Sequence, residues 1–372
     1  MMKLEQITLY HLQMPLVAPF ATSFGSIDTR ECILLEVRAD GIVGWGECVA
    51  DRDPGYAYET VGTAWHILND FLIPPLFGQE IMDAPDLQSQ MSHVKGHQMA
   101  KAGIEMAVWD LTGKMQGISV RELLGGDRRK VDVGVSVGIQ ENLSELLSVV
   151  ENYLTDGYQR VKLKIKPGRD VADTKAVRDS FPDLRLQVDA NSAYVLENAD
   201  MLKPLDEMSL LLIEQPLAED DLWDHHRLQA RFKTPICLDE SITSLRHARQ
   251  ALEMKSCRVI NIKQGRVGGL SQAAAIHDFC QTQNIPVWCG GMLETGLGRA
   301  ANLALASLSN FSLPGDISAT DRYYVQDITQ ERFVLNTDST IDVPEGAGLG
   351  VNIDRIALKK FTLAQKELSF RS

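Results

Sequence analysis

From Val131 onward the chain repeats one pattern, a short apolar run that is in most cases followed by a stretch of helical character. Strands that alternate with helices predict an α/β fold with a parallel sheet, because each helix returns the chain to the edge where the previous strand began. This recurrence limits the possible folds more than any other feature of the sequence. Seven runs show it: VDVGVSVG, VKLKI, LRLQVDAN, LLLIEQP, PICLDES, VINIKQG and IPVWCGG.

The second to sixth runs each carry a charged residue at the C-terminal end of the predicted strand, and these residues recur at nearly constant intervals. They are Lys164, Asp189, Glu214, Asp239 and Lys263, at steps of 25, 25, 25 and 24 residues. One strand–helix unit of a TIM-type barrel takes roughly 25 to 30 residues. We therefore predict a barrel whose consecutive strands present these side chains at the same height, at the mouth where such barrels keep their active sites.

Three carboxylates on neighbouring strands predict a metal site. An acidic residue after a strand is also a common helix N-cap, but three such residues at equal spacing indicate that they form one site together. Carboxylates within a few ångströms of one another need a cation, and a hard divalent metal provides it. No His or Cys belongs to the cluster, so Asp189, Glu214 and Asp239 are predicted to bind Mg²⁺, for which Mn²⁺ or another divalent cation can substitute.

Lysines flank this acidic cluster. In VKLKIK, Lys162, Lys164 and Lys166 would project to one side of a strand, and Lys166 precedes Pro167-Gly168 and is expected in the loop. Lys164 and Lys263 belong to strands on opposite sides of the carboxylate strands, so a substrate on the metal would meet one lysine on each face. Burial and a neighbouring cation such as Lys162 lower the pKa of a lysine toward the working range.

The first 125 residues have a different, α+β pattern. ECILLEVRADGIVGWGEC predicts two strands around a tight Asp40-Gly41 turn, and the stretch from Tyr58 to about Leu124 is mostly helical in pattern. The clearest helix is MAKAGIEMAVWDLTGKMQG, in which four apolar residues form one stripe and Gly103 and Asp110 fall outside it. This segment predicts a smaller unit beside the barrel.

Composition and charge narrow the possible partners. The 372 residues carry a net charge of −13 with no block of basic residues, which argues against nucleic acid or an anionic membrane surface and favours a small ligand. The cysteines are scattered without a Cys-x-x-Cys pair, as expected for reduced thiols. There is no signal-peptide pattern and no apolar run long enough to span a bilayer. We expect a cytoplasmic homo-oligomer without a membrane partner.

Five motifs lie on the second to sixth predicted strands: KLK, VDAN, IEQP, LDES and NIKQGRVGG. Together they resemble the enolase superfamily, muconate-lactonizing subgroup. Within that subgroup the sequence is most similar to the N-succinylamino acid racemase / o-succinylbenzoate synthase family. The resemblance runs along nearly the whole chain and includes MPLVAPFATSFG, GWGEC, KGHQMAKAGIEMAVWDL and PVWCGGMLETGLGRAANLALASL.

The resemblance implies a modified TIM barrel over residues 126–329, whose last units depart from strict β/α alternation. An α+β capping domain would consist of residues 1–125, completed by the C-terminal tail, about residues 330–372. Two lid segments, around Phe20 to Gly25 and around Asp51 to Tyr58, would close over the active site and exclude water.

The resemblance also implies roles for single residues. The three strand-end carboxylates would bind Mg²⁺, Lys164 and Lys263 would be the acid/base pair, and Lys162 would assist them. Contacts with the substrate are implied for seven further residues: Ser136, Asn191, Gly291, Met292, Leu293, Phe20 and Tyr323.

The implied reaction is metal-dependent removal of a proton α to a carboxylate, through an enediolate. In racemisation, one lysine removes the proton and the other returns it from the opposite face. In the synthase reaction, a dehydration of the menaquinone pathway, Lys164 would take the proton and assist hydroxide departure while Lys263 stabilises the enediolate. One site could perform both reactions on a small-molecule carboxylate.

Other functions remain as alternatives. Dipeptide epimerases of the subgroup carry Asp-x-Asp at the end of strand 8, where this chain has GDIS with Ser318 in place of the second acid, and a muconate cycloisomerase shares the scaffold. A non-catalytic metal-dependent binding protein predicts loss of one of the two lysines, and both are present. A Schiff-base aldolase would use one lysine without needing three carboxylates in register. Gln264, where close relatives are expected to have Pro, leaves Lys263 in place.

Overall fold

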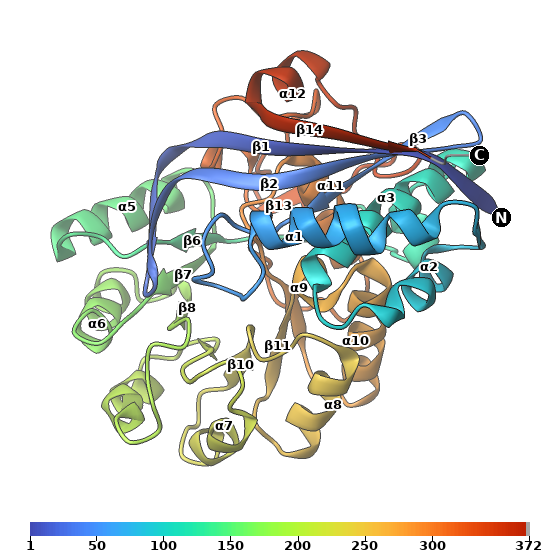
Figure 1. Ribbon diagram of the computed structural model, residues 1–372. Coiled ribbons are helices and arrows are strands. Elements are labelled where there is room, and N and C mark those ends of the chain that lie inside the picture. Colours follow the sequence, from blue (N-terminus) through green and yellow to red (C-terminus); the bar gives the residue numbers. More distant parts are fainter. Residues whose placement is uncertain (370–372) are drawn as a thin grey trace.

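The amino-terminal unit is built on an antiparallel sheet that lies across the barrel (Figure 1). The computed structural model describes residues 1–369. The predicted hairpin turn is confirmed, because Asp40 and Gly41 have φ values of 51° and 74°, the left-handed values that a tight two-residue turn uses. The sheet has the order β14-β1-β2-β3, from β1 (Met2–Thr22), β2 (Gly25–Ala39), β3 (Ile42–Cys48) and β14 (Thr362–Ser369), and the short β4 (Glu80–Ile81) pairs with β1.

Helices occupy most of residues 61–124, as predicted. They are α1 (Val61–Ile67), the π-helical turn η1 (Leu68–Leu72), the 3₁₀ turns η2 (Pro74–Leu76) and η3 (Met91–His93), α2 (Ala84–Gln90), α3 (Gln98–Gln116) and α4 (Val120–Leu124).

Helix α3 lies against β3 on one side and the barrel on the other, and it is buried on nearly all sides. Gly103 and Asp110, outside the apolar stripe in the sequence pattern, are buried as well. The Asp110 carboxylate accepts hydrogen bonds from the backbone N–H groups of Trp45 and Leu349 at 2.8 Å each. A buried polar residue thus ties the helix to the sheet and to the C-terminal segment.

Seven parallel strands form the curled barrel sheet, and each overlaps one of the predicted runs, although one strand begins a residue earlier, at Arg160; this confirms the α/β prediction (Figure 1). In spatial order they are β12 (Val287–Cys289), β11 (Val259–Ile262), β10 (Ile236–Leu238), β9 (Ile213–Glu214), β8 (Arg185–Asp189), β7 (Arg160–Lys164) and β6 (Val135–Val137). The connecting helices include α5 (Leu143–Thr155), α6 (Val171–Ser180), α7 (Leu222–Gln229), α8 (Leu245–Glu253) and α10 (Leu270–Thr282).

Strict alternation fails in three places. A 3₁₀ helix with Pro204 inside it, η4 (Ala199–Glu207), connects β8 to β9. The short α9 (Gln264–Val267) precedes α10, so two helices follow β11. The third departure comes after β12 and its helix α11 (Gly296–Ala306). Beyond α11, no eighth strand forms within residues 1–369. An irregular segment closes the barrel instead: Gly315 donates to the carbonyl of Asp132 at 3.0 Å, and Asp316 donates to the carbonyl of Cys289 at 2.8 Å.

The C-terminal segment contacts both units. After the 3₁₀ turn η5 (Thr320–Arg322), β13 (Thr340–Asp342) pairs with β5 (Lys130–Asp132), α12 (Arg355–Phe361) follows, and β14 pairs with β1. One hydrophobic cluster includes side chains of β1, of the barrel and of this segment, so the units share a core. The boundaries at residues 125 and 329 stay predictions. Among the described helices, none is both long and apolar enough to cross a membrane.

Candidate active site

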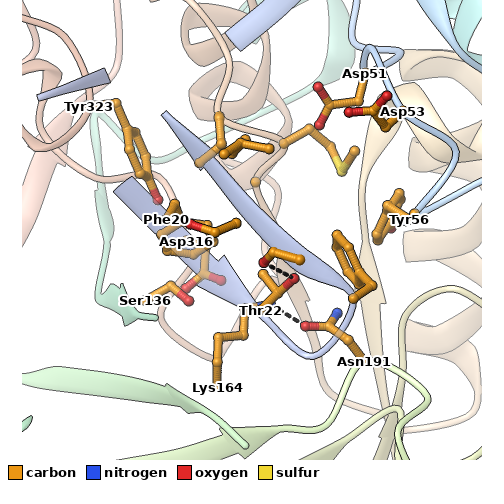
Figure 2. Close-up of a pocket in the computed structure, with 18 of the residues that line it drawn as sticks. Phe20, Thr22, Asp51, Asp53, Tyr56, Ser136, Lys164, Asn191, Asp316 and Tyr323 are labelled. Carbon is orange, nitrogen blue, oxygen red and sulfur yellow. Dashed lines mark hydrogen bonds between the residues drawn. The ribbon is translucent and has the colours of Figure 1, made fainter. Parts of the chain in front are cut away.

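A cavity lies between the carboxyl ends of the barrel strands and the tip of the β1–β2 hairpin (Figure 2). Its lining includes the three predicted lysines and all seven predicted substrate contacts. The three predicted metal ligands do not line it. They are buried beside it, with at most 1% of each residue exposed. The structure therefore brings together residues from both units, as the sequence analysis predicts for an active site.

The predicted row of charged residues is present, and it is staggered in the strand register. Lys164 is the register partner of Asp189, and Asp189 is the register partner of Glu214. Asp239 lies two residues beyond the register partner of Glu214, and Lys263 likewise lies two residues beyond the register partner of Asp239. In a barrel of eight strands, side chains at one level advance in register by about one residue per strand, so this offset over four strand steps agrees with the predicted common height. Strands in a barrel are tilted and their register shifts around the circumference, which explains the stagger.

Lys162 lies at the centre of a buried charge network. Its Nζ is 3.1 Å from Asp189, 2.9 Å from Glu214 and 2.7 Å from Asp316. The ring centroid of Trp288 is 4.9 Å away. Burial by itself disfavours the ammonium form, but the three carboxylates outweigh it and hold the pKa of Lys162 well above its usual value. Lys162 is therefore suited to stabilising negative charge and unsuited to removing a proton.

Lys164 has different surroundings, although it is only two residues away. Its Nζ donates hydrogen bonds to Asp189 and to Oδ1 of Asn191, both at 2.7 Å. Burial, assisted by the positive charge of Lys162, outweighs the effect of Asp189 and lowers the pKa of Lys164 below its usual value. The direction agrees with the sequence-based prediction, and it favours a neutral amine that can accept a proton.

Lys263 differs from Lys164 in this respect. Its Nζ lies 2.8 Å from Asp239 and donates to the Tyr56 hydroxyl at 3.1 Å. Burial lowers the pKa of Lys263, but the acidic groups of Tyr56, Glu240 and Glu214 outweigh it, and the pKa lies above its usual value. The prediction that burial and a neighbouring cation lower the pKa of a catalytic lysine is thus confirmed for Lys164 and wrong for Lys263.

The strand-end carboxylates are paired with cationic side chains. Burial opposes ionisation of Asp189, but two lysines outweigh it and keep its pKa below the usual value, whereas burial and the charge of Asp189 raise the pKa of Glu214. Asp239 is held by a lysine and by Arg266. With these cations against the carboxylates, no three His, Cys, Asp or Glu side chains in residues 1–369 converge as a ready-made metal site.

The donor set nevertheless fits a hard divalent cation. Asp189, Glu214 and Asp239 offer oxygen ligands from three adjacent strands, without imidazole or thiolate. Beside them, Oε2 of Glu240 is buried and has no hydrogen-bond partner within the described chain, and burial raises the pKa of Glu240 to about 7. The chemistry of these groups favours Mg²⁺ over zinc, and ligation by the three carboxylates stays a prediction.

The predicted substrate contacts form the remaining wall of the cavity. Phe20 and Tyr323 meet edge to face, with ring centroids 6.3 Å apart, and make an apolar surface (Figure 2). Oγ of Ser136, in the middle of β6, is buried and lacks a hydrogen-bond partner among residues 1–369. The side chain of Asn191, a predicted substrate contact, bridges Lys164 and Glu240.

Three further residues belong to the site although the sequence analysis gave them no role there. Asp316 forms ion pairs with Lys162 and, at 2.6 Å, with Arg160. Tyr56 and Arg266 both contact Asp239. The signals were present, since Asp316 belongs to GDIS, Tyr56 lies within a predicted lid and Arg266 is the charged residue of GRVGG. Their partners are more than 25 positions away, so spacing alone does not pair them.

Both predicted lid segments lie over the cavity. Residues 20–25 form the tip of the β1–β2 hairpin, and Oγ of Ser23 donates to the carbonyl of Asn191 at 3.1 Å. The second segment meets the first where Gly55 approaches Phe24, since a Cβ at Gly55 would lie 2.7 Å from the phenylalanine ring. The two segments therefore contact each other as well as the barrel.

Both the sequence and the structure of this chain are similar to those of known proteins. A model of the mandelate racemase / muconate lactonizing enzyme N-terminal domain matches residues 5–125, and one described as enolase C-terminal domain-like matches residues 145–357. An o-succinylbenzoate synthase of Geobacillus kaustophilus is 51% identical over 361 residues, which cover 96% of each chain. An N-succinylamino acid racemase of Amycolatopsis sp is 51% identical over 351 residues, 94% of this chain and 95% of that one. A crystal structure of an enolase superfamily member from Listeria innocua matches with a TM-score of 0.95 at 43% identity, over 99% of this chain and 100% of that one.

Proposed function

The chain belongs to the enolase superfamily, within the family of mandelate racemase and muconate lactonizing enzyme, and on that premise we propose that it removes a proton from the carbon α to a substrate carboxylate. The overall reaction is the dehydration that o-succinylbenzoate synthases perform, the racemisation that N-succinylamino acid racemases perform, or both at one site.

One observation carries the proposal. Lys164, at the end of β7, and Lys263, directly after β11, flank the three carboxylate strands and both line the same cavity. A substrate carbon held between them has one amine on each face, which is the requirement for removing a proton on one side and returning it on the other.

The pKa values of the two lysines are shifted in opposite directions, and this supports different roles for them. The lowered pKa of Lys164 favours proton removal, whereas the raised pKa of Lys263 favours the ammonium form, which can donate a proton or stabilise a developing negative charge. Lys162 adds a permanent positive charge on the side of Lys164. Ser136 and the loop at Gly291 would bind the polar part of the substrate, and the wall of Phe20 and Tyr323 its apolar part.

Asp189, Glu214 and Asp239 would hold a divalent cation, with Mg²⁺ the favoured ion. When bound, this cation would neutralise the charge of the substrate carboxylate. The cationic side chains now paired with these carboxylates must then shift part of their contacts toward the substrate. Metal dependence is common to the family, and the oxygen-only donor set of this chain agrees with it.

Two observations weigh against the epimerase alternative. Ser318 stands where the second acid of Asp-x-Asp is expected, and its side chain is buried. Asp316, in the first position of that motif, is already paired with Arg160 and Lys162, so it is a poor partner for a substrate ammonium group.

Proton NMR in D₂O tests the proposal. The protein is incubated with an N-succinyl-L-amino acid and Mg²⁺, with a matched sample that contains a chelator. We expect metal-dependent loss of the α-proton signal and appearance of the D enantiomer. If several side chains give no exchange, the racemase half of the proposal is wrong, and a direct assay of the synthase dehydration then decides the other half.

A further inference from the structure

We infer that Tyr56 is a positioning residue for Lys263, through which the loop of residues 51–60 controls one of the two lysines and not the other. The inference rests on the proposed two-lysine function and extends it to a residue outside the barrel. Figure 2 shows the Tyr56 ring at the edge of the cavity, on the loop that also carries Asp51 and Asp53.

The Tyr56 hydroxyl is the meeting point of three charged groups. It donates to Oδ1 of Asp239 at 2.9 Å and accepts from Nζ of Lys263 at 3.1 Å and from Arg266 at 3.3 Å. The ammonium group of Lys263 also lies 4.3 Å from the centroid of the Tyr56 ring, within the range of a cation–π interaction. Tyr56 therefore contacts Lys263 through both its hydroxyl and its ring.

These contacts restrict a side chain that is otherwise flexible. A lysine has four rotatable bonds, so two contacts from different directions are needed to hold its nitrogen at one place. For Lys263 those contacts are Asp239 and Tyr56. Proton transfer at carbon depends on the position of the nitrogen, and a misplacement of about 1 Å can slow an enzyme by about 10²-fold.

The two lysines differ in where their partners come from. Lys164 is bound by Asp189 and Asn191, which both belong to the barrel. Tyr56, by contrast, belongs to the amino-terminal unit. Loss of the Tyr56 contacts should therefore disturb Lys263 and leave Lys164 unchanged.

The loop that carries Tyr56 is anchored to its own unit. Arg30, which is 1% exposed, forms an ion pair with Asp51 at 3.0 Å and donates to the backbone carbonyls of Val49 and Ala50. At the other end, the N–H of Val61 donates to the carbonyl of Asp51 at 2.7 Å. These anchors fix the base of the loop, so its position relative to the barrel sets the position of Tyr56 over Lys263.

The Tyr56→Phe variant tests the inference, because it removes the hydroxyl and keeps the ring. The initial rate of α-proton exchange in D₂O is measured separately for the two enantiomers of one N-succinylamino acid. Lys263→Ala identifies the enantiomer whose exchange needs Lys263. We expect Tyr56→Phe to slow exchange of that enantiomer by about 10-fold or more and to leave the other within about twofold, since only one nitrogen is released.

A structural or metal-binding role would give a different result. Either would slow both enantiomers equally, so equal slowing at saturating Mg²⁺ overturns the inference, as does an unchanged rate for both. Tyr10→Phe is the matched control, since Tyr10 also donates to a carboxylate, Glu36, that is paired with an arginine, and it lies away from the cavity. Its exchange rates should equal those of the unaltered protein. If the unaltered protein exchanges neither enantiomer, the racemase half of the proposed function fails and this inference fails with it.

Discussion

Replacing Glu47 by Gln is expected to change how the stability of the protein depends on pH. Glu47, on β3, is fully buried and links the capping sheet to the start of α11. Its carboxylate accepts hydrogen bonds from the hydroxyl of Thr295 at 2.6 Å and from the N–H of Gly298 at 2.9 Å. Burial nevertheless dominates and raises the pKa of Glu47 from 4.5 to about 7.

The sign and size of the effect follow from this shift. The folded protein binds the Glu47 proton more tightly than the unfolded chain, so the stability that this group contributes is fully present below pH 4.5 and is lost as the pH rises through about 7. One pKa unit corresponds to about 1.4 kcal/mol, and about 2.5 kcal/mol of the loss falls between about pH 5 and pH 8. Glutamine does not titrate, so Glu47→Gln does not suffer this loss. Its free energy of unfolding minus that of the unaltered protein should therefore be about 2.5 kcal/mol more favourable at about pH 8 than at about pH 5.

Urea unfolding at about pH 5 and about pH 8, monitored by circular dichroism, measures the free energy of unfolding of both proteins at each pH. Any constant cost of placing an amide opposite the N–H groups cancels in the comparison. Glu36→Gln is the control: burial opposes ionisation of Glu36, but Arg355 and Tyr10 outweigh it and hold its pKa below 4.5. Its effect on stability should therefore be the same at both pH values. If the effect of Glu47→Gln is also unchanged between them, Glu47 is ionised throughout and the reasoning is refuted.

Three further predictions concern the lysines, the charge network and the packing of the sheet. Lys164→Ala and Lys263→Ala should each reduce turnover by at least about 10²- to 10⁴-fold with an unchanged circular dichroism spectrum, and full activity in either variant would contradict the two-lysine mechanism. Asp316→Asn weakens the pairing of two buried cations, 2.6 and 2.7 Å away, and should lower the free energy of unfolding by about 3–5 kcal/mol in urea titrations; a loss below about 1 kcal/mol would mean that the ion pairs are dispensable. Gly46→Ala places a Cβ 2.0 Å from a backbone oxygen of α3 and should cost about 1–3 kcal/mol or more, seen as a lower Tm. At the control position Gly62, in α1, an added Cβ would make only an ordinary contact, with the Thr60 hydroxyl oxygen at 3.8 Å. Gly62→Ala should therefore raise stability by up to about 1 kcal/mol, and equal effects of the two substitutions would contradict the packing argument.

Local patterns in the sequence were sufficient to predict the architecture. Alternating apolar runs gave all seven barrel strands, and Asp40-Gly41 gave the turn of the capping hairpin. Equal spacing identified Lys164 and Lys263 on the two sides of the carboxylate strands. These features are predictable because hydrophobic periodicity and turn chemistry act over a few residues, and because one strand–helix unit has a nearly constant length.

Tertiary structure alone decided how the charged groups of the site are paired. The register of the strands sets Asp239 two residues beyond the partner of Glu214, and the closing segment brings Asp316 against Lys162. The opposite pKa shifts of Lys164 and Lys263 depend on burial and on neighbours that are distant in the sequence, among them Tyr56 on a loop of the other unit. Electrostatic interactions depend on separation in space and on local solvation, and neither is encoded in the spacing of residues along the chain.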